Sequence, residues 1–315
     1  MALKIPFGGI HMFTKNLVVV LMSLAVFLYS PGNAEEKSGS RIEEEQNYIS
    51  FHKIEKAWRV SKGRGVKVAV LDWLFDMSPK ASQKYIDPIS LVPGHEVGSS
   101  EPWHGEWMAE IVHRIAPAAK IIPIRARPPK DEIPKNNPNE QPYEQYLIEG
   151  IYYAADHGAA AVTNSMGPVR LTEKLINAVK YAEKKGTVFI NVHPEYLERK
   201  NESFIFCDSS QCSPLIIHTG IVSVPEYPLK PESNRDIYTW PYEMNPKFKD
   251  GWGFSNGPPI VTGIIALMKS INPELSVKEV KEIIIRTADI AGGFKVINAD
   301  KAVKNARKLK FAREI

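Results

Sequence analysis

Three side chains with complementary chemistry occur along the chain in the order aspartate, histidine, serine. Asp72 ends an apolar, β-branched run over residues 66–71, and His104 opens a stretch with apolar residues at helical spacing. Ser255 lies just after a glycine and precedes a proline-led apolar run. A serine hydroxyl is a poor nucleophile unless an imidazole takes its proton and a carboxylate fixes the tautomer of that imidazole. The sequence therefore offers Asp72, His104 and Ser255 as candidate catalytic residues.

Each of these residues is expected at the end of a regular element. The run at 66–71 predicts a buried strand, which would place Asp72 at its carboxyl end. The spacing after His104 predicts a helix that ends at Ala116-Pro117. The glycine and prolines around Ser255 predict a turn that enters a buried helix. Unpaired N–H groups and the positive end of the helix dipole at such a turn favour an oxyanion.

Strand and helix patterns alternate through the rest of the chain, which predicts a parallel sheet covered by helices. Strands are predicted at 119–124, 160–164, 187–192 and 215–224, and helices at 143–157, 172–185 and 276–288.

Together these motifs resemble those of the subtilisin-like serine peptidases, the subtilase family. The segment from Gly63 to Asp72, His104-Gly105 with Ala109, and Gly253-Phe254-Ser255 are similar to the family's Asp, His and Ser motifs. The order Asp, His, Ser is also that of subtilisin. The resemblance runs from about Lys53 to Ala302 and implies an α/β, three-layer fold with a mostly parallel sheet covered by helices on both faces.

The resemblance implies an exported serine endopeptidase that hydrolyses peptide bonds. Ser255 would attack the carbonyl carbon, His104 would act first as base and then as acid, and Asp72 would orient His104. Ser165 and Gly167 would bind the backbone of a peptide or protein substrate. No cofactor and no metal site is predicted, and the sequence carries no readable calcium site.

One position of the family pattern carries an unexpected residue. The asparagine that donates to the oxyanion falls, by count, on Glu195. An ionised carboxylate there would repel the developing charge, and losing that donor costs roughly 100- to 1000-fold in turnover in subtilisin. A protonated Glu195, or Asn191 or His193 turned towards the oxyanion, would restore a donor.

The neighbours of the three candidate residues also depart from the family pattern. Trp73 replaces a small residue after Asp72, Glu106 follows His104-Gly105, and Phe254 precedes Ser255. Glu195, Trp73, Phe254 and the missing pro-domain motivate an alternative function: a catalytically impaired pseudopeptidase that binds a peptide or a partner protein.

Residues 1–34 have the features of a signal peptide. Lys15 precedes an apolar stretch over 17–29, which is short for a membrane span, and small residues precede Glu35. An uncleaved anchor is the alternative. The prediction is a secreted or periplasmic protein with no stable membrane span after cleavage. Residues 35–50 would be a short N-terminal segment without a full pro-domain, and 51–315 the peptidase domain.

The two cysteines, Cys207 and Cys212, stand close together in the sequence. In an exported chain this pair favours a disulfide that closes a small loop, with two reduced thiols as the alternative. A metal pair is disfavoured because no histidine stands beside them at ligand spacing.

The charge balance excludes one class of partner. The formal net charge is +4 and falls to +2 without the leader lysines Lys4 and Lys15. A protein that binds nucleic acid through its phosphates needs a larger basic excess. We expect no nucleic-acid partner, and a monomer that acts on peptides or proteins.

Overall fold

The structure is a computed structural model that describes nine parts of the chain, all of which fall in the unit Glu43–Ile315. They are residues 48–99, 101, 103–128, 144–167, 171–192, 215–225, 228–231, 235–242 and 253–314.

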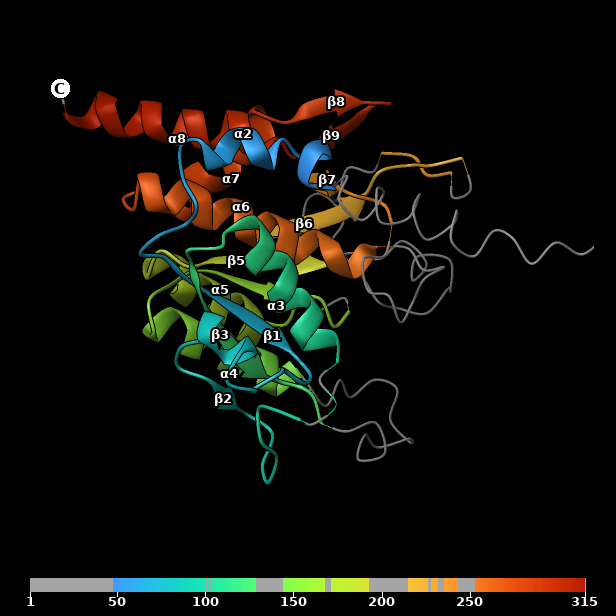
Figure 1. Cartoon of the computed structure of the whole chain (residues 1–315), viewed down its shortest axis with the longest axis vertical. Helices are drawn as coiled ribbons and strands as arrows, with labels where there is room; N and C mark the ends of the chain where they lie inside the picture. The colour runs from blue at the N-terminus through green and yellow to red at the C-terminus, as the bar shows by residue number, and fades with distance from the viewer. Residues whose placement is uncertain are drawn as a thin grey trace, which may run out of the picture. The chain divides into compact units, whose positions relative to one another are not determined.

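A nine-stranded sheet in the order β2-β3-β1-β4-β5-β6-β7-β9-β8 forms the centre of the fold (Figure 1). Every pairing is parallel except the β8–β9 hairpin. The strands are β1 (Lys67–Asp72), β2 (Ile89–Ser90), β3 (Lys120–Arg125), β4 (Ala159–Asn164), β5 (Val188–Val192), β6 (Ile216–Ile221), β7 (Ile237–Thr239), β8 (Asp289–Ala291) and β9 (Phe294–Val296).

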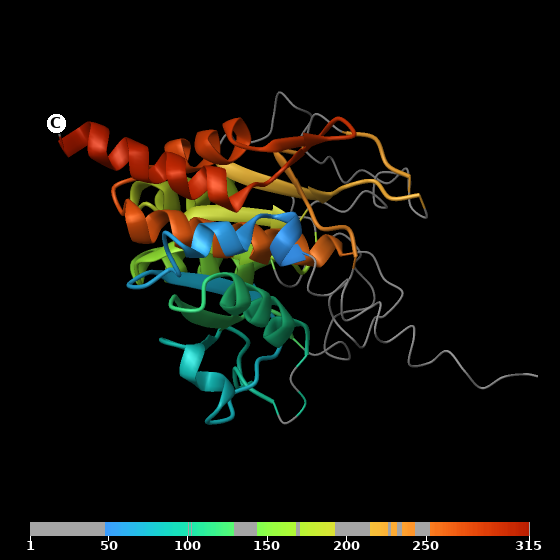
Figure 2. The same ribbon diagram turned by 45° about the horizontal axis from the view of Figure 1, so that its top comes forward.

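Helices cover both faces of this sheet (Figures 1 and 2). They are α2 (Ile54–Trp58), α3 (His104–Ile115), α4 (Glu144–Asp156), α5 (Glu173–Lys184), α6 (Gly257–Ile271), α7 (Val277–Arg286) and α8 (Ala299–Glu314), with short 3₁₀ turns η1 (Ala81–Lys84) and η5 (Phe254–Asn256). Helices α3 and α6 pack on one face, α4 and α5 on the other, and α8 packs against the outer side of α6 with α2 and α7 beside it. The predicted three-layer α/β class is confirmed.

The central strands are apolar because helices bury them on both sides. In β1 every residue from Val68 to Asp72 is buried, and β5 and β6 are buried throughout. Helix α6 is buried from Gly257 to Lys269 because it lies between the sheet and α8. Its unbroken apolar run in the sequence therefore reflects a position inside the fold.

A glycine sets how closely the two helices on this face approach each other. A Cβ atom added to Gly263 in α6 would lie 2.7 Å from Cγ2 of Ile115 in α3. The absence of a side chain at Gly263 therefore lets α3 and α6 pack closely. These two helices also carry or adjoin two of the candidate catalytic residues, His104 and Ser255.

The parallel strands end along one edge of the sheet. Asn164 at the end of β4 pairs with Leu71 of β1 on one side and with Asn191 of β5 on the other. Helix α3 also begins at this edge of the sheet. Its first residue, His104, contacts Asp72 at the end of β1. Side chains from distant parts of the sequence are therefore brought together where the strands end.

No helix among these described parts of the chain is both long and apolar enough to cross a lipid bilayer. The predicted leader, 1–34, lies outside the described residues.

Candidate active site

Asp72 and His104 form a hydrogen-bonded pair. Asp72 is fully buried as the last residue of β1, and His104 is the first residue of α3. The Nδ1 atom of His104 lies 2.8 and 2.9 Å from the two carboxylate oxygens of Asp72. Since an ionised carboxylate only accepts, Nδ1 carries the hydrogen, and Nε2 of the neutral ring is the acceptor. This is the tautomer that a general base needs.

The segment that follows Asp72 lies directly against the first turn of α3. The backbone N–H of Glu106 donates to the carbonyl of Leu74 at 3.0 Å. A Cβ atom added to Gly105 would lie 2.9 Å from the same carbonyl oxygen and 3.2 Å from Cβ of Asp72. A glycine after His104 is therefore required for Asp72 and His104 to come this close.

Ser255 lies in the 3₁₀ turn η5, immediately before α6, and α3 contacts this turn. Its Oγ donates to the carbonyl of Ser165 at a long 3.4 Å, and Oγ of Ser165 donates to the carbonyl of Ser255 at 2.8 Å. The backbone N–H of Asn256 donates to the carbonyl of Gly253. The predicted glycine turn into a buried helix is thus present, and the fold brings Ser165 beside Ser255.

Gly167 follows Ser165 at the end of β4 and has a φ of 136°, a backbone region that favours glycine. Its carbonyl accepts a hydrogen bond of 3.1 Å from Nδ2 of Asn164. Ser165, which lies beside Ser255, and Gly167 therefore belong to one turn at the end of β4. Their role in binding a substrate stays a prediction.

The side chain of Asn191 makes hydrogen bonds within the protein at the carboxyl ends of the strands. Its Nδ2 donates to the carbonyl of Val192 at 2.9 Å, and its Oδ1 accepts from Nδ2 of Asn164 at 2.8 Å. The residue is only 2% exposed. These contacts disfavour Asn191 as the alternative oxyanion donor. Glu195 and His193 lie outside the described residues, so the composition of the oxyanion site stays a prediction.

Two tryptophans and an arginine gather beside the Asp72–His104 pair. The rings of Trp73 and Trp103 have centroids 4.3 Å apart, and the Trp73 ring lies 6.0 Å from the imidazole of His104. The guanidinium carbon of Arg127 is 4.2 Å from the Trp73 ring centroid, a cation–π distance. The sequence marks Trp73 as a departure from a motif but does not single out Trp103 or Arg127. The one signal that could have indicated Trp103 is its position next to His104.

Among the described residues, no group of three or more His, Cys, Asp or Glu side chains is arranged to hold a metal ion. Cys207 and Cys212 lie outside those residues, so the predicted disulfide is untested.

Comparisons with known proteins agree with this fold. A model of the Subtilase family matches residues 223–311. Thermitase of Thermoactinomyces vulgaris is 26% identical over 146 residues, which cover 43% of this chain and 49% of thermitase. The match therefore spans about half the length of that curated relative.

Solved structures share the same architecture at low sequence identity. A protease of Pseudoalteromonas arctica superposes with a TM-score of 0.62 at 16% identity, over 84% of this chain and 97% of that chain. MycP1 of Mycobacterium smegmatis gives a TM-score of 0.62 at 18% identity, over 81% and 83% of the two chains. Fervidolysin of Fervidobacterium pennivorans, a keratinolytic enzyme related to subtilisin, gives a TM-score of 0.62 at 18% identity, over 79% of this chain and 44% of fervidolysin.

These likenesses establish a subtilisin-like fold, as the sequence predicted. The family model and the thermitase match are further similarities to subtilases, each over part of the chain.

Proposed function

We propose that the chain is an exported serine endopeptidase with Asp72, His104 and Ser255 as its catalytic residues. The observation that carries this proposal is the short contact between His104 Nδ1 and the buried Asp72 carboxylate, which favours the imidazole tautomer in which Nε2 can accept a proton. A contact between α3, which begins at His104, and η5, which holds Ser255, supports the proposal.

The reaction would proceed by proton transfer and attack at a single carbonyl. Nε2 of His104 takes the Ser255 hydroxyl proton while Oγ attacks the carbonyl carbon of a peptide, and the imidazolium then protonates the leaving amine. Asp72 keeps the ring in the required tautomer and stabilises its charged form. The backbone N–H of Ser255, beside the amino end of α6, is the proposed oxyanion donor.

The location and the chain organisation belong to the same proposal. Residues 1–34 would direct export to a secreted or periplasmic location, where Cys207 and Cys212 would form a disulfide. The peptidase domain would cover 51–315. Tyr48, just before this range, is 1% exposed and packs in the same core, so the folded domain also draws on the residues that precede position 51.

The test is covalent labelling of the exported form, residues 35–315, with a fluorophosphonate probe, followed by casein digestion. Fluorophosphonates react with an activated serine Oγ, which displaces fluoride. We expect labelling and cleavage in the wild-type chain, loss of both in Ser255→Ala, and retention of both in the half-buried control Ser82→Ala. Labelling that persists in Ser255→Ala would refute the assignment of the nucleophile.

A second candidate function is favoured by Glu195, which stands where the family pattern has the asparagine that donates to the oxyanion. A pseudopeptidase would bind peptides without cleaving them. It predicts that the wild-type chain is neither labelled nor active, yet retains casein peptides in a pull-down that does not depend on Ser255.

A further inference from the structure

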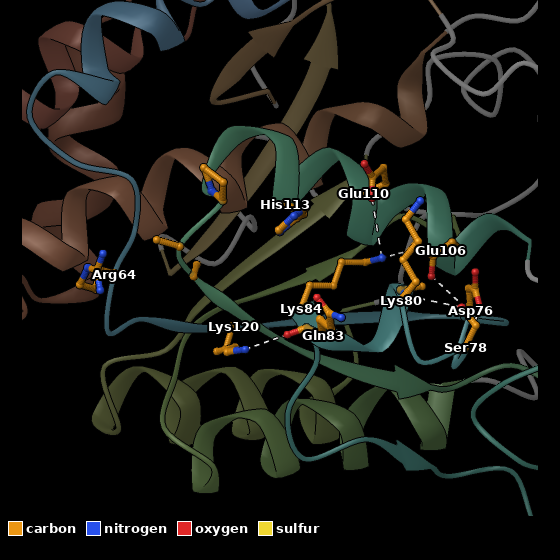
Figure 3. Close-up of a pocket in the computed structure, with 14 residues that line it drawn as sticks. Arg64, Asp76, Ser78, Lys80, Gln83, Lys84, Glu106, Glu110, His113 and Lys120 are labelled. Carbon is orange, nitrogen blue, oxygen red and sulfur yellow. Dashed lines mark hydrogen bonds and ion pairs between the residues drawn. The ribbon is translucent and has the colours of Figure 1, made fainter.

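The carboxylate of Glu106 joins three separate segments of the chain (Figure 3). Its Oε2 accepts from the backbone N–H of Asp76 at 2.8 Å and from the hydroxyl of Tyr85 at 2.5 Å. Its Oε1 accepts from Nζ of Lys84 at 2.6 Å. A carboxylate has enough lone pairs for all three donors at once, whereas a neutral amide does not.

This network is largely shielded from water. The side chains of Lys84 and Glu106 are 6% and 18% exposed, and Glu110 lies 3.7 Å from the same Nζ atom. Burial, reinforced by the nearby charge of Glu106, raises the pKa of the Tyr85 hydroxyl, which therefore stays protonated and donates. Ion pairs screened from water in this way are costly to break from one side.

The network connects the two segments that carry Asp72 and His104. Glu106 is in the first turn of the helix that starts at His104, and Asp76 follows shortly after Asp72. The Asp76–Glu106 hydrogen bond thus lies beside the Asp72–His104 hydrogen bond and joins the same two segments. The backbone bond from Glu106 N–H to Leu74 adds a third connection.

Glu106 also lines a depression of about 730 Å³ together with Lys80, Lys120 and His113 (Figure 3). Both of its carboxylate oxygens already accept hydrogen bonds from the protein. Its position is therefore explained by contacts within the fold, without a ligand in the depression.

We propose that Glu106 is a positioning residue, which holds the loop after β1 against the first turn of α3 and so keeps Asp72 and His104 in hydrogen-bonding geometry. The inference rests on the proposed function in one respect, namely that this pair serves catalysis. A displacement of about 1 Å in a catalytic group can cost about 100-fold in rate, so the loss of this support should be visible in turnover.

The test compares Glu106→Gln with Glu110→Gln, a matched change one helical turn further along α3 beside the same lysine. The first readout needs no activity: a proton held between an imidazole nitrogen and a carboxylate resonates far downfield of other N–H protons. We expect this signal from the Asp72–His104 pair in wild type and Glu110→Gln, and its loss or upfield shift in Glu106→Gln.

The second readout is turnover. We expect kcat of Glu106→Gln to fall about 10- to 100-fold with KM changed less than about twofold, and Glu110→Gln to stay near wild type. Tyr85→Phe, which removes one donor and adds no polar group, should move both readouts in the same direction by less. This variant keeps the test valid if Glu106→Gln does not fold.

Three outcomes would decide the matter. A merely structural role predicts a lower melting temperature for Glu106→Gln with an unchanged downfield signal and kcat, and that result would overturn the proposal. Absence of the downfield signal from the wild-type protein would overturn it as well. A wild-type protein that shows the signal, loses it in Glu106→Gln and yet cleaves nothing would support the positioning role and refute the proposed peptidase function.

Discussion

The two halves of the candidate site are held in different ways. Around Asp72 and His104, charged and polar groups dominate: a buried carboxylate, the Glu106 network and its lysine. Around Ser255, the support is α6, which is apolar and buried over most of its length, and the hydrogen bonds among the described residues lie in short turns. The acid–base half should therefore respond to changes of charge, and the nucleophile half to changes of volume.

The largest expected effect tests the charge dependence of the acid–base half. Asp72→Asn places an amide against Nδ1 of His104, and an N–H group facing that nitrogen favours the wrong imidazole tautomer. Such a change costs roughly 10⁴-fold in kcat in another Ser-His-Asp enzyme, and we expect a loss of that order. Steady-state kinetics on a peptide substrate measures it.

The control for this variant is Asp87→Asn, which removes a carboxylate that pairs with Lys67 at 3.0 Å outside the site. It should keep kcat near wild type. Equal losses in the two variants would mean that the general loss of negative charge matters, and not the contact with His104.

The next effect concerns the acid stability of the fold, outside the candidate site. His52 is fully buried, with Nδ1 2.9 Å from the carbonyl of Ile297 and Nε2 3.1 Å from the backbone N–H of Trp240. The carbonyl can only accept and the N–H can only donate, so the ring must be neutral with its hydrogen on Nδ1. Burial lowers the pKa of His52 from 6.5 to about 4.

Because the folded state disfavours the protonated ring, the unfolded chain binds more protons below pH 6.5. The stability that neutral His52 supplies is present above that pH and is lost as the pH falls, by about 3 kcal/mol at pH 4. Burial also lowers the pKa of His218 to about 3, which adds a loss of the same sign. Urea unfolding between pH 7 and pH 4 measures the sum.

His52→Asn removes one of these titrating groups. The variant should be less stable than wild type at pH 7 but should lose less stability than wild type on acidification. An identical acid-induced loss in wild type and variant would contradict the role of His52.

The smallest expected effect tests the volume dependence of the nucleophile half. In Gly263→Ala the new Cβ meets Cγ2 of Ile115 at 2.7 Å, and overpacking of this kind costs about 1–3 kcal/mol. Alanine also raises helix propensity by about 1 kcal/mol, so the net loss is small. Calorimetry should show a melting temperature lower by a few degrees, with the Asp72–His104 proton signal unchanged.

Adding Ile115→Ala to this variant removes the Cγ2 atom at 2.7 Å but keeps Cβ of residue 115, which would lie 2.8 Å from the new Cβ, so the clash is relieved only in part. The two changes should therefore couple favourably in a double-mutant cycle. A melting temperature raised by Gly263→Ala alone would show that α3 and α6 can separate without cost, against the close packing described above.

Periodicity and caps in the sequence predicted the elements that position the site. Helix α3 begins at His104 as expected, and α7 begins after Ser276, whose side chain and Glu279 form a capping box. These signals are local: a capping side chain and its partner are three residues apart, and a helix face repeats within a turn or two.

Short strands were not predicted from the sequence. Strands β7, β8 and β9 have three residues each and β2 has two, which is too few for a period of two to be recognised. One signal was available and missed: Gly292-Gly293, both with positive φ, form the turn of the β8–β9 hairpin.

The Glu106 network could not have been predicted from the sequence. Its partners Asp76, Lys84 and Tyr85 lie 30, 22 and 21 residues away, in segments with no regular spacing relative to α3. The sequence identified Glu106 only as a departure from a family motif. The close approach of the loop after β1 depends on tertiary packing, which no local pattern encodes.

The separation of the two halves along the chain has a consequence for how the protein is made. The Asp72–His104 bond joins residues 32 apart, inside the stretch from β1 to β3, whereas the Ser165–Ser255 bond joins residues 90 apart. Contacts between near neighbours form sooner than distant ones, and synthesis delivers the amino end first. We therefore expect Asp72 and His104 to pair on the nascent chain before Ser255 is in place, so that the candidate site is complete only when α6 docks.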